Sequence, residues 1–292
     1  MLKNIRTIRT DLAVECLSEA GSSLLQGVCR NTETIGRTPV TRVIIETQQA
    51  AQTIGKPVGK YVTVETTPFH RFATDFEEQV KIVGNEIKSL LPDGPTLVVG
   101  LGNSAITPDA LGPEVINLIF ATRHLQKDFA SISGFEHLRG AAAIAPGVLG
   151  QTGIETAEII SAIVREIKPE AVIVIDALAS REIARLGATV QISDTGIAPG
   201  SGVANHRKEL TQKTLGVPVI AVGVPTVVDM NTIAEDLAEG QPVSLPEKGK
   251  NMMVTPREID TIIENAAKTV AFGINLALQP TLSLDDVISL VN

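Results

Sequence analysis

Short apolar runs alternate with helical patterns along the chain from residue 95 onward. Runs of four to eight residues, rich in β-branched side chains, are typical of strands covered on both faces, and they lie at 96–101, 141–145, 171–175, 189–192 and 217–224. Between them, apolar positions spaced by three and four indicate helices at 113–125, 154–167 and 257–278. This alternation predicts an α/β fold with three layers, α/β/α, in which helices cover both faces of a mostly parallel central sheet.

The N-terminal 70 residues follow a less regular pattern. We expect residues 1–35 to be weakly structured, and residues 40–47 and 60–66, which are rich in β-branched residues, to form strands. An amphipathic helix is predicted by apolar residues at steps of three and four, namely Phe76, Val80, Val83, Ile87 and Leu90. Residues 237–250 contain two prolines and two glycines and are expected to form a loop. We therefore predict one continuous α/β core, to which the first 70 residues are partly added.

The composition excludes several classes of function. The 292 residues include 25 Lys and Arg against 33 Asp and Glu, and the resulting net charge of −8 disfavours binding to a nucleic-acid backbone. Aromatic residues make up only 3%, which disfavours base stacking and a membrane-interface belt. Two cysteines, Cys16 and Cys29, are too few for a disulfide-rich secreted domain, and we expect reduced thiols. With neither a secretory signal nor 18 consecutive apolar residues, the sequence predicts a cytoplasmic protein.

A glycine-bearing loop follows the predicted strand at 96–101. Gly100 and Gly102 suggest a dinucleotide fingerprint, but Ala105 stands where the third glycine would be needed. No acidic residue ends a second strand about 20 residues later, as a ribose-binding site requires. Nucleotide binding is therefore disfavoured.

The same loop carries Asp109, just before a predicted helix. One interpretation is local: aspartate is favoured as the N-cap of a helix, and Asn103 in the same loop suits a turn. The other is chemical, because ligands bind in open α/β sheets beyond the carboxyl ends of parallel strands, where this loop is expected. From these residues alone both interpretations stay open.

A second carboxylate, Asp176, directly follows the buried run AVIVI at 171–175. A charge at the end of a buried strand is costly unless it is hydrogen-bonded or functional. If the strands before Asp109 and Asp176 are neighbours, the two carboxylates face one crevice, where one can hold a proton and polarise a carbonyl while the other activates water. Alternatively, Asp176 pairs with Arg181 or caps the next helix.

Further polar loops are expected at the same edge of the sheet. One contains Asp194 and Gly196, with the glycine-rich segment 199–203 after it, and another is formed by residues 225–229. Loops of this kind suit a lid or a peptide-binding wall, and simple chain reversal explains each of them equally well.

Taken together, these motifs resemble the germination protease family of spore-forming bacteria. The matching segments run nearly end to end: IRTDLAVE (8–15), VVGLGNSAITPDALGP (98–113), TRHL (122–125), APGVLGQTGIET (145–156), IVIDALASR (173–181), QISDTGIAPGSGV (191–203), TLGVPVIAVGVPTVVD (214–229) and MVTPREID (253–260). Two features depart from the family pattern, because the loop at 237–250 is shorter than in longer members and the leader before IRTDLA is very short.

The resemblance implies an endopeptidase that degrades small acid-soluble spore proteins during germination, in the cytoplasm of the forespore and the spore core. It implies a fold similar to the hydrogenase maturation endopeptidases, an atypical aspartic mechanism with Asp109 and Asp176 as the catalytic pair, and no cofactor or metal. Gly102, Asn103, Asp194 and Gly196 are then expected to bind substrate or support the site.

The resemblance further implies a homotetramer made as a zymogen that cleaves itself. The segment from Thr10 to Glu15 looks like the family's substrate site, so the cut is expected between Asp11 and Leu12. Residues 1–11 would then be a propeptide and 12–292 a single peptidase domain. An N-terminus that mimics substrate can occupy the crevice until acidification favours the singly protonated carboxylate pair.

Two alternatives remain open. A metal-assisted endopeptidase would use the two carboxylates with a histidine, for which His206 is the candidate, although a solvated loop histidine explains that residue as well. A non-catalytic module would hold a basic or DNA-coating protein on an acidic surface. No nucleic-acid or membrane partner is expected under any of these readings.

Overall fold

The computed structural model describes residues 10–19, 26–128, 137–198, 208–238, 246, 249 and 252–291. The described strands are β1 (Val28–Ile35), β2 (Thr38–Ile45), β3 (Gly59–Glu65), β4 (Thr96–Gly100), β5 (Ala141–Ile144), β6 (Ala171–Ser180), β7 (Thr189–Ser193), β8 (Val219–Asp229) and β9 (Met253–Val254). The described helices are α1 (Ala13–Glu19), α2 (Gln48–Ile54), α3 (Phe76–Leu90), η1 (Thr107–Asp109), α4 (Leu111–Asn117), α5 (Arg123–Asp128), α6 (Leu149–Thr152), α7 (Thr156–Ile167), η2 (Ile183–Arg185), α8 (Gln212–Leu215), α9 (Met230–Leu237), α10 (Ile259–Leu278) and α11 (Leu284–Val291).

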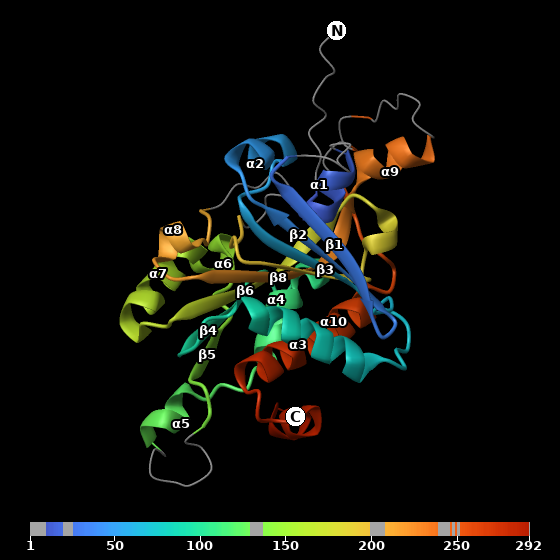
Figure 1. The fold of residues 1–292 in the computed structure, drawn as a ribbon. Helices are drawn as coiled ribbons and strands as arrows, with labels where there is room; N and C mark the ends of the chain where they lie inside the picture. The colour runs from blue at the N-terminus through green and yellow to red at the C-terminus, as the bar shows by residue number, and fades with distance from the viewer. Residues whose placement is uncertain are drawn as a thin grey trace.

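These strands form one sheet in the order β1-β2-β3-β7-β8-β6-β4-β5, with β9 paired to β8 (Figure 1). The α/β class is as predicted, but the prediction of a mostly parallel sheet is wrong. Only the pairs β4–β5, β4–β6 and β6–β8 are parallel, whereas β1–β2, β2–β3, β3–β7, β7–β8 and β8–β9 are antiparallel. The sheet is mixed because the N-terminal meander of β1, β2 and β3 joins it through β7, which is antiparallel to both β3 and β8.

The meander also corrects the prediction for residues 1–35. Residues 1–9 and 20–25 lie outside the described residues, but α1 and β1 are regular elements. β1 and β2 form a hairpin around Gly36, whose φ of 59° is favourable for glycine in a tight turn. The first 70 residues are thus not an appendage, because β3 pairs with β7 in register Val62↔Ile192.

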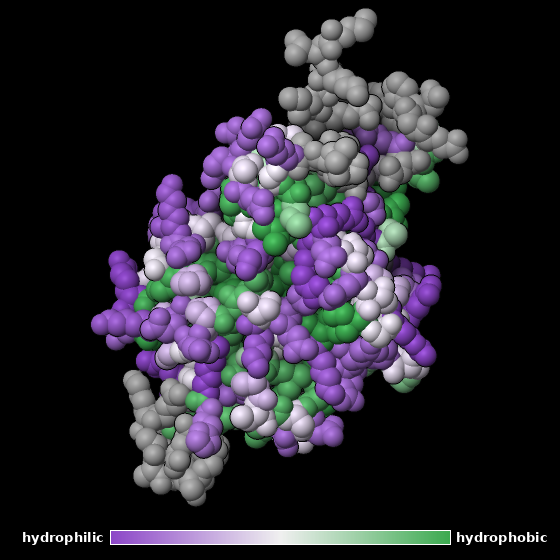
Figure 2. Space-filling model, viewed as in Figure 1, coloured by the Kyte–Doolittle hydropathy of each residue, from purple (hydrophilic) through white to green (hydrophobic). Residues whose placement is uncertain are grey.

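Helices cover both faces of the sheet, which completes the three predicted layers (Figure 1). On one face, α3, α4 and α10 pack on the strands in a large apolar core. On the other, α7 and α8 cover β4, β6 and β8, while α1 and α2 cover β2 and β3. In the view of Figure 2, apolar groups show as patches separated by hydrophilic side chains, as expected for helices with one buried face.

The helix predicted at 113–125 is interrupted. α4 ends at Asn117, and α5 begins at Arg123. Between them the chain is fixed to the start of β5, because the Thr122 amide donates to the Ala141 carbonyl (2.9 Å) and the Ala141 amide donates to the Thr122 hydroxyl (2.9 Å). A tertiary contact therefore overrides the local helical pattern.

Strands β6 and β8 extend well beyond their predicted ends at residues 175 and 224. They stay paired from Val172↔Val219 to Ser180↔Val228, with a register shift between Leu178 and Ala179. Asp176 was expected to follow the strand, but it lies inside β6. The extended β6–β8 ribbon carries Asp176 and, beyond it, the stretch of β6 against which the N-terminal segment lies. Among the described residues, no helix is long and apolar enough to cross a membrane.

Candidate active site

The loop after β4 begins beside the middle of the neighbouring strand β6, which runs from Ala171 to Ser180. The Leu101 amide donates to the Ile175 carbonyl (2.8 Å), so the loop starts beside the residue that precedes Asp176. It closes on itself where the Asn103 amide donates to the Asp109 carbonyl (3.0 Å). The loop therefore brings Asp109 back to the carboxyl end of the β4–β6 pair, where Asp109 is half-buried.

Gly102 fits directly beneath Asp109. Its φ is 114°, a conformation that favours glycine, and a Cβ at this position would lie 2.0 Å from the Asp109 carbonyl oxygen and 3.3 Å from its Oδ1. Any side chain at residue 102 would therefore push Asp109 out of place. Gly102 supports the candidate site through backbone shape rather than through a functional group.

Two threonines that the sequence analysis did not single out hold the other side of η1. The Thr226 hydroxyl donates to the Pro108 carbonyl (2.8 Å), and the Thr255 hydroxyl donates to the Thr226 carbonyl (2.8 Å). Both contacts connect sites far apart in the sequence, so no local signal could have revealed them. They fix η1, and with it Asp109, to the extended part of β8.

Helix capping does not explain Asp109. α4 begins at Leu111 with Ala110 as its N-cap residue, and no side chain caps it. Asn103, by contrast, is a turn residue: its Oδ1 accepts from the Ala105 amide (3.0 Å) and from the Gln151 side chain (2.8 Å) of α6. Asn103 thus connects the loop after β4 with the loop after β5.

Asp176 is buried within β6, with 7% of its surface exposed. Its Oδ1 accepts a hydrogen bond from the Ala177 amide (3.0 Å). Since side chains alternate along a strand, Asp176 lies on the same face as Val172, Val174 and Leu178, the face that α7 covers. A carboxylate in this apolar layer is costly unless it is hydrogen-bonded or functional.

Asp194 and Gly196 do not lie at the edge where they were expected. β7 runs antiparallel to β8, and Ser193 pairs with Ala221, so the loop after β7 starts toward the opposite edge from the one that β6 and β8 reach. Asp194 accepts from the Lys60 amide (2.7 Å) at the start of β3, which is a structural contact. Gly196, with φ 75°, packs against the Leu210 carbonyl, and the next residue, Ile197, crosses back to Leu178. The glycine-rich segment 199–203 is outside the described residues.

The N-terminal segment Thr10–Glu15 lies against the extension of β6. The Asp11 amide donates to the Ala179 carbonyl (2.9 Å), and the Ala179 amide donates to Asp11 Oδ2 (2.9 Å). Leu12, fully buried, packs with Val14 on Leu178. Leu178 and Ala179 lie two and three residues beyond Asp176, so the segment around the Asp11–Leu12 bond is held about 7–10 Å farther along β6 than Asp176.

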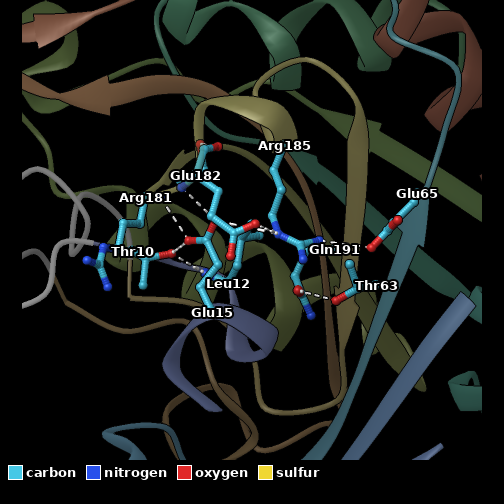
Figure 3. A network of polar contacts seen from close by, with 10 residues as sticks. Thr10, Leu12, Glu15, Thr63, Glu65, Arg181, Glu182, Arg185 and Gln191 are labelled. Atoms are coloured by element: carbon cyan, nitrogen blue, oxygen red, sulfur yellow. Dashed lines mark hydrogen bonds and ion pairs between the residues drawn. The ribbon is translucent and has the colours of Figure 1, made fainter. Parts of the chain in front are cut away.

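Glu15 fixes the end of this segment (Figure 3). Only 2% of Glu15 is exposed, and its two carboxyl oxygens accept from the Arg181 amide (2.8 Å) and the Glu182 amide (3.0 Å). The Thr10 hydroxyl also donates to Glu15. Burial raises the pKa of Glu15, an effect that these hydrogen bonds partly offset.

The described part of the chain contains no group of three or more His, Cys, Asp or Glu side chains that could hold a metal ion. His206, the candidate third ligand, lies outside the described residues. What the described residues do supply at this end of the β4–β6 pair is one carboxylate in η1 after β4, one carboxylate within β6, and a peptide segment docked farther along β6.

Comparisons with known proteins agree with the motifs. A family model described as germination protease matches residues 7–239. The germination protease of Clostridium tetani is 42% identical over 98% of this chain and 100% of its own length. That of Caldanaerobacter subterraneus is 44% identical over 94% of this chain and 95% of its own length, and that of Geobacillus is 37% identical over 96% of both. Among solved structures, the [NiFe] hydrogenase maturation protease HycI of Thermococcus kodakarensis matches with a TM-score of 0.35 and 16% identity, over 65% of this chain and 98% of that one.

Proposed function

The chain belongs to the germination protease family, a family of peptidases, and on this premise we propose that it is an endopeptidase that begins the degradation of small acid-soluble spore proteins during germination. The observation that carries the proposal is the docking of the chain's own Thr10–Glu15 segment along β6. A polypeptide is held there by packing on Leu178 and by hydrogen bonds to Ala179, two and three residues beyond Asp176. A substrate polypeptide can be held in the same way.

The proposed chemistry uses Asp109 and Asp176 as a pair. One carboxylate, when ionised, accepts a proton from water as the water attacks the peptide carbonyl. The other, when protonated, donates a hydrogen bond to the carbonyl oxygen and stabilises the charge that develops on it. Two carboxylates at one site favour such a division because like charges raise the pKa of one partner. This reaction requires neither a metal nor an organic cofactor.

The docked segment also suggests how activity is restrained. Cleavage between Asp11 and Leu12 would remove residues 1–11 as a propeptide and leave 12–292 as a single peptidase domain. Until substrate displaces it, the segment blocks the stretch of β6 that we propose substrates use. We also propose that the protein assembles as a homotetramer and acts in the forespore and the spore core.

The test is a cleavage assay with a small acid-soluble spore protein. Asp109→Asn and Asp176→Asn should each reduce cleavage by at least about 10²-fold while leaving the fold intact, because each removes a proton-transfer group. Asp93→Asn, at an exposed position outside the site, is the matched control and should retain activity. Full activity in either active-site variant would reject the pair.

Two further outcomes identify the alternatives. Loss of activity with a chelator and recovery with added metal would establish metal-assisted hydrolysis instead. Binding of the spore protein without fragments, in the fully processed chain, would indicate a non-catalytic module.

A further inference from the structure

Strand β1 forms an open edge of the sheet. It is the first strand in the sheet order, and it pairs with β2 from Val28↔Ile45 to Ile35↔Thr38 (Figure 1). Residues 29–34 are exposed, so none of the described helices covers either face of this part of the strand. At the other end of the described sheet, β5 is only four residues long. β5 thus has the shortness that protects an edge strand, whereas β1 offers eight residues for pairing.

The backbone groups of alternate residues of β1 point away from the sheet. In an antiparallel ladder, a residue whose N–H and C=O groups bond to the partner strand alternates with one whose groups point away. The Glu46 amide donates to the Gly27 carbonyl (2.8 Å), so the odd-numbered residues of β1 face β2. Four residues therefore direct their N–H and C=O groups toward the open edge: Val28, Arg30, Thr32 and Thr34.

β1 lacks the features with which proteins usually protect such an edge. Its sequence, VCRNTETI, contains neither proline nor lysine, and its register with β2 has no bulge. Its two charged residues, Arg30 and Glu33, have opposite signs, so a second copy of the strand meets no uniform charge. An unprotected edge of this length is a template for another strand.

One register lets this edge pair completely with its own copy. When two antiparallel copies are related by a two-fold axis at Asn31, Val28 of one copy lies opposite Thr34 of the second, and Arg30 lies opposite Thr32. All the outward-facing residues then pair, which forms about eight backbone hydrogen bonds. Moving the axis by one residue leaves Val28 or Thr34 of each copy without a partner in the strand.

The side chains are compatible with the same register. Arg30 lies opposite Thr32 of the second copy, and Glu33 lies opposite Cys29, so no like charges are directly opposed. Glu33 also keeps its ion pair with Arg42 (2.6 Å) of its own copy. The two-fold arrangement therefore satisfies the backbone groups of the edge without a repulsive contact.

We propose that β1 pairs antiparallel with β1 of a second copy of this chain, about a two-fold axis at Asn31, so that two nine-stranded sheets continue as one. This contact closes after two copies, whereas pairing of β1 with β5 of another copy is head-to-tail and continues into a ring or a filament. It supplies one interface of the proposed homotetramer. It concerns assembly alone, so it is tested separately from peptide cleavage.

A disulfide across the axis tests the register. Asn31→Cys is combined with Cys29→Ser, so that the introduced thiol is the only one in β1. The two Cα atoms at position 31 then lie about 4.5 Å apart, within the range of about 4.4–6.8 Å that a disulfide spans. Mild oxidation should therefore link most of the protein into dimers. Glu33→Cys with Cys29→Ser is the matched control, because its two thiols lie at least about 13 Å apart and should stay unlinked.

The native cysteine provides a second signature of the same register. Cys29 lies opposite position 33 of the second copy, so Glu33→Cys should form dimers when Cys29 is retained and none with Cys29→Ser. Within one copy, positions 29 and 33 lie about 13 Å apart along the strand and cannot link to each other. Linking of Glu33→Cys therefore has to depend on Cys29 of another copy.

A proline at the edge tests the hydrogen bonds. Thr32→Pro removes an outward N–H near the axis and leaves the bonds between β1 and β2 in place. Thr32→Val keeps the N–H but loses the same hydroxyl contact with Thr41 (3.1 Å), so it is the matched control. By light scattering, Thr32→Pro should have about half the wild-type mass and Thr32→Val the full mass. Circular dichroism checks that both variants remain folded.

Linking of both position-31 and position-33 thiols in the Cys29→Ser chain, or of neither, would overturn the pairing. So would a wild-type mass of one copy, or a folded Thr32→Pro variant with the wild-type mass. Loss of the link at position 31 on addition of a small acid-soluble spore protein would assign the edge to a substrate polypeptide instead. Cleavage of that protein by the same preparations reports the proposed function independently.

Discussion

Replacing Gly102 with alanine is the most informative single change at the candidate site, because it displaces Asp109 without altering any functional group. A Cβ at residue 102 would lie 2.0 Å from the Asp109 carbonyl oxygen, and Cβ atoms in real structures stay at least 3.0 Å from other heavy atoms. The difference, 3.0 − 2.0, requires a shift of about 1 Å, and the loop that carries Asp109 is the part that must move.

A shift of this size has a calculable effect on catalysis. Misplacing a reacting group by about 1 Å can cost about 10²-fold in rate, which corresponds to about 2.7 kcal/mol of transition-state stabilisation. Alanine at a positive φ also costs about 1–2 kcal/mol of folding free energy. We therefore expect Gly102→Ala to remain folded, with Tm lower by several degrees and kcat/KM for peptide cleavage lower by about 10²-fold.

A second glycine separates the two effects. Gly216 also has a positive φ, 79°, but a Cβ there meets nothing within 4 Å. Gly216→Ala thus carries the backbone strain without the clash, and it should lose stability while keeping its activity. Kinetics with a peptide substrate and thermal unfolding of both variants provide the comparison.

The reasoning would be refuted by a Gly102→Ala enzyme whose kcat/KM stays within about twofold of wild type. That result would mean that the loop absorbs the Cβ without moving Asp109, or that the position of Asp109 is irrelevant to the reaction. Equal losses of activity in Gly102→Ala and Gly216→Ala would attribute the effect to strain alone.

Three further predictions concern the docked N-terminal segment. Because burial raises the pKa of Glu15, docking of the segment should be strongest below the ordinary glutamate pKa and should weaken as pH rises through the raised value. Hydrogen exchange at the Asp11 amide, corrected for the intrinsic exchange rate, should therefore show protection that falls as pH rises. Protection that grows with pH would contradict this prediction. Leu12→Ala removes a fully buried side chain and should destabilise the docked state by about 2–5 kcal/mol, whereas Leu12→Met should destabilise it by less than about 1.5 kcal/mol. The rate of limited proteolysis of the segment measures both effects. Lys56→Met removes the ammonium that donates to the Thr10 and Asp11 carbonyls (3.4 and 3.0 Å), so an added protease should cut the segment about fivefold faster; an unchanged rate would show that these contacts contribute nothing.

Much of the fold is predictable because burial imposes a period on the sequence. The run predicted as a strand at 96–101 forms β4 at Thr96–Gly100, and every residue of that strand is buried. The helix predicted at 257–278 forms α10 at Ile259–Leu278, with its apolar side on the sheet. In these segments the pattern and the tertiary environment agree, so propensity and packing lead to the same structure.

Strand direction could not be predicted in the same way. The apolar run at 189–192 has the same pattern whether it pairs parallel or antiparallel. Its direction depends on β3, where Thr63 donates to Gln191 (3.0 Å), a residue 128 positions away in the sequence. The antiparallel course of β7 moved Asp194 away from the expected edge. The error in topology therefore misplaced this loop relative to the other loops of the candidate site.

Asp176 could be singled out because it directly follows an apolar run, where an ionisable side chain needs a reason, and Asp109 because its loop follows a predicted parallel strand. The parts that surround them have no comparable signal. Thr226 and Thr255 fit ordinary strand and loop positions, and their role comes only from the long-range contacts that hold η1. The contacts of Glu15 with the amides of residues 181 and 182 are likewise invisible in a local pattern, because backbone donors leave no trace in the sequence.

The continuation of β6 beyond Asp176 gives the site its organisation. Had the strand ended at residue 175, as its apolar pattern predicts, Asp176 would stand at an open edge with nothing beside it to align a polypeptide. Because β6 stays paired with β8 as far as Ser180, it offers Leu178, Ala179 and the turn after the strand as successive contacts for a bound chain. The candidate chemistry and the docking of the N-terminal segment thus depend on one structural feature, which is why we expect changes along residues 178–182 to alter both together.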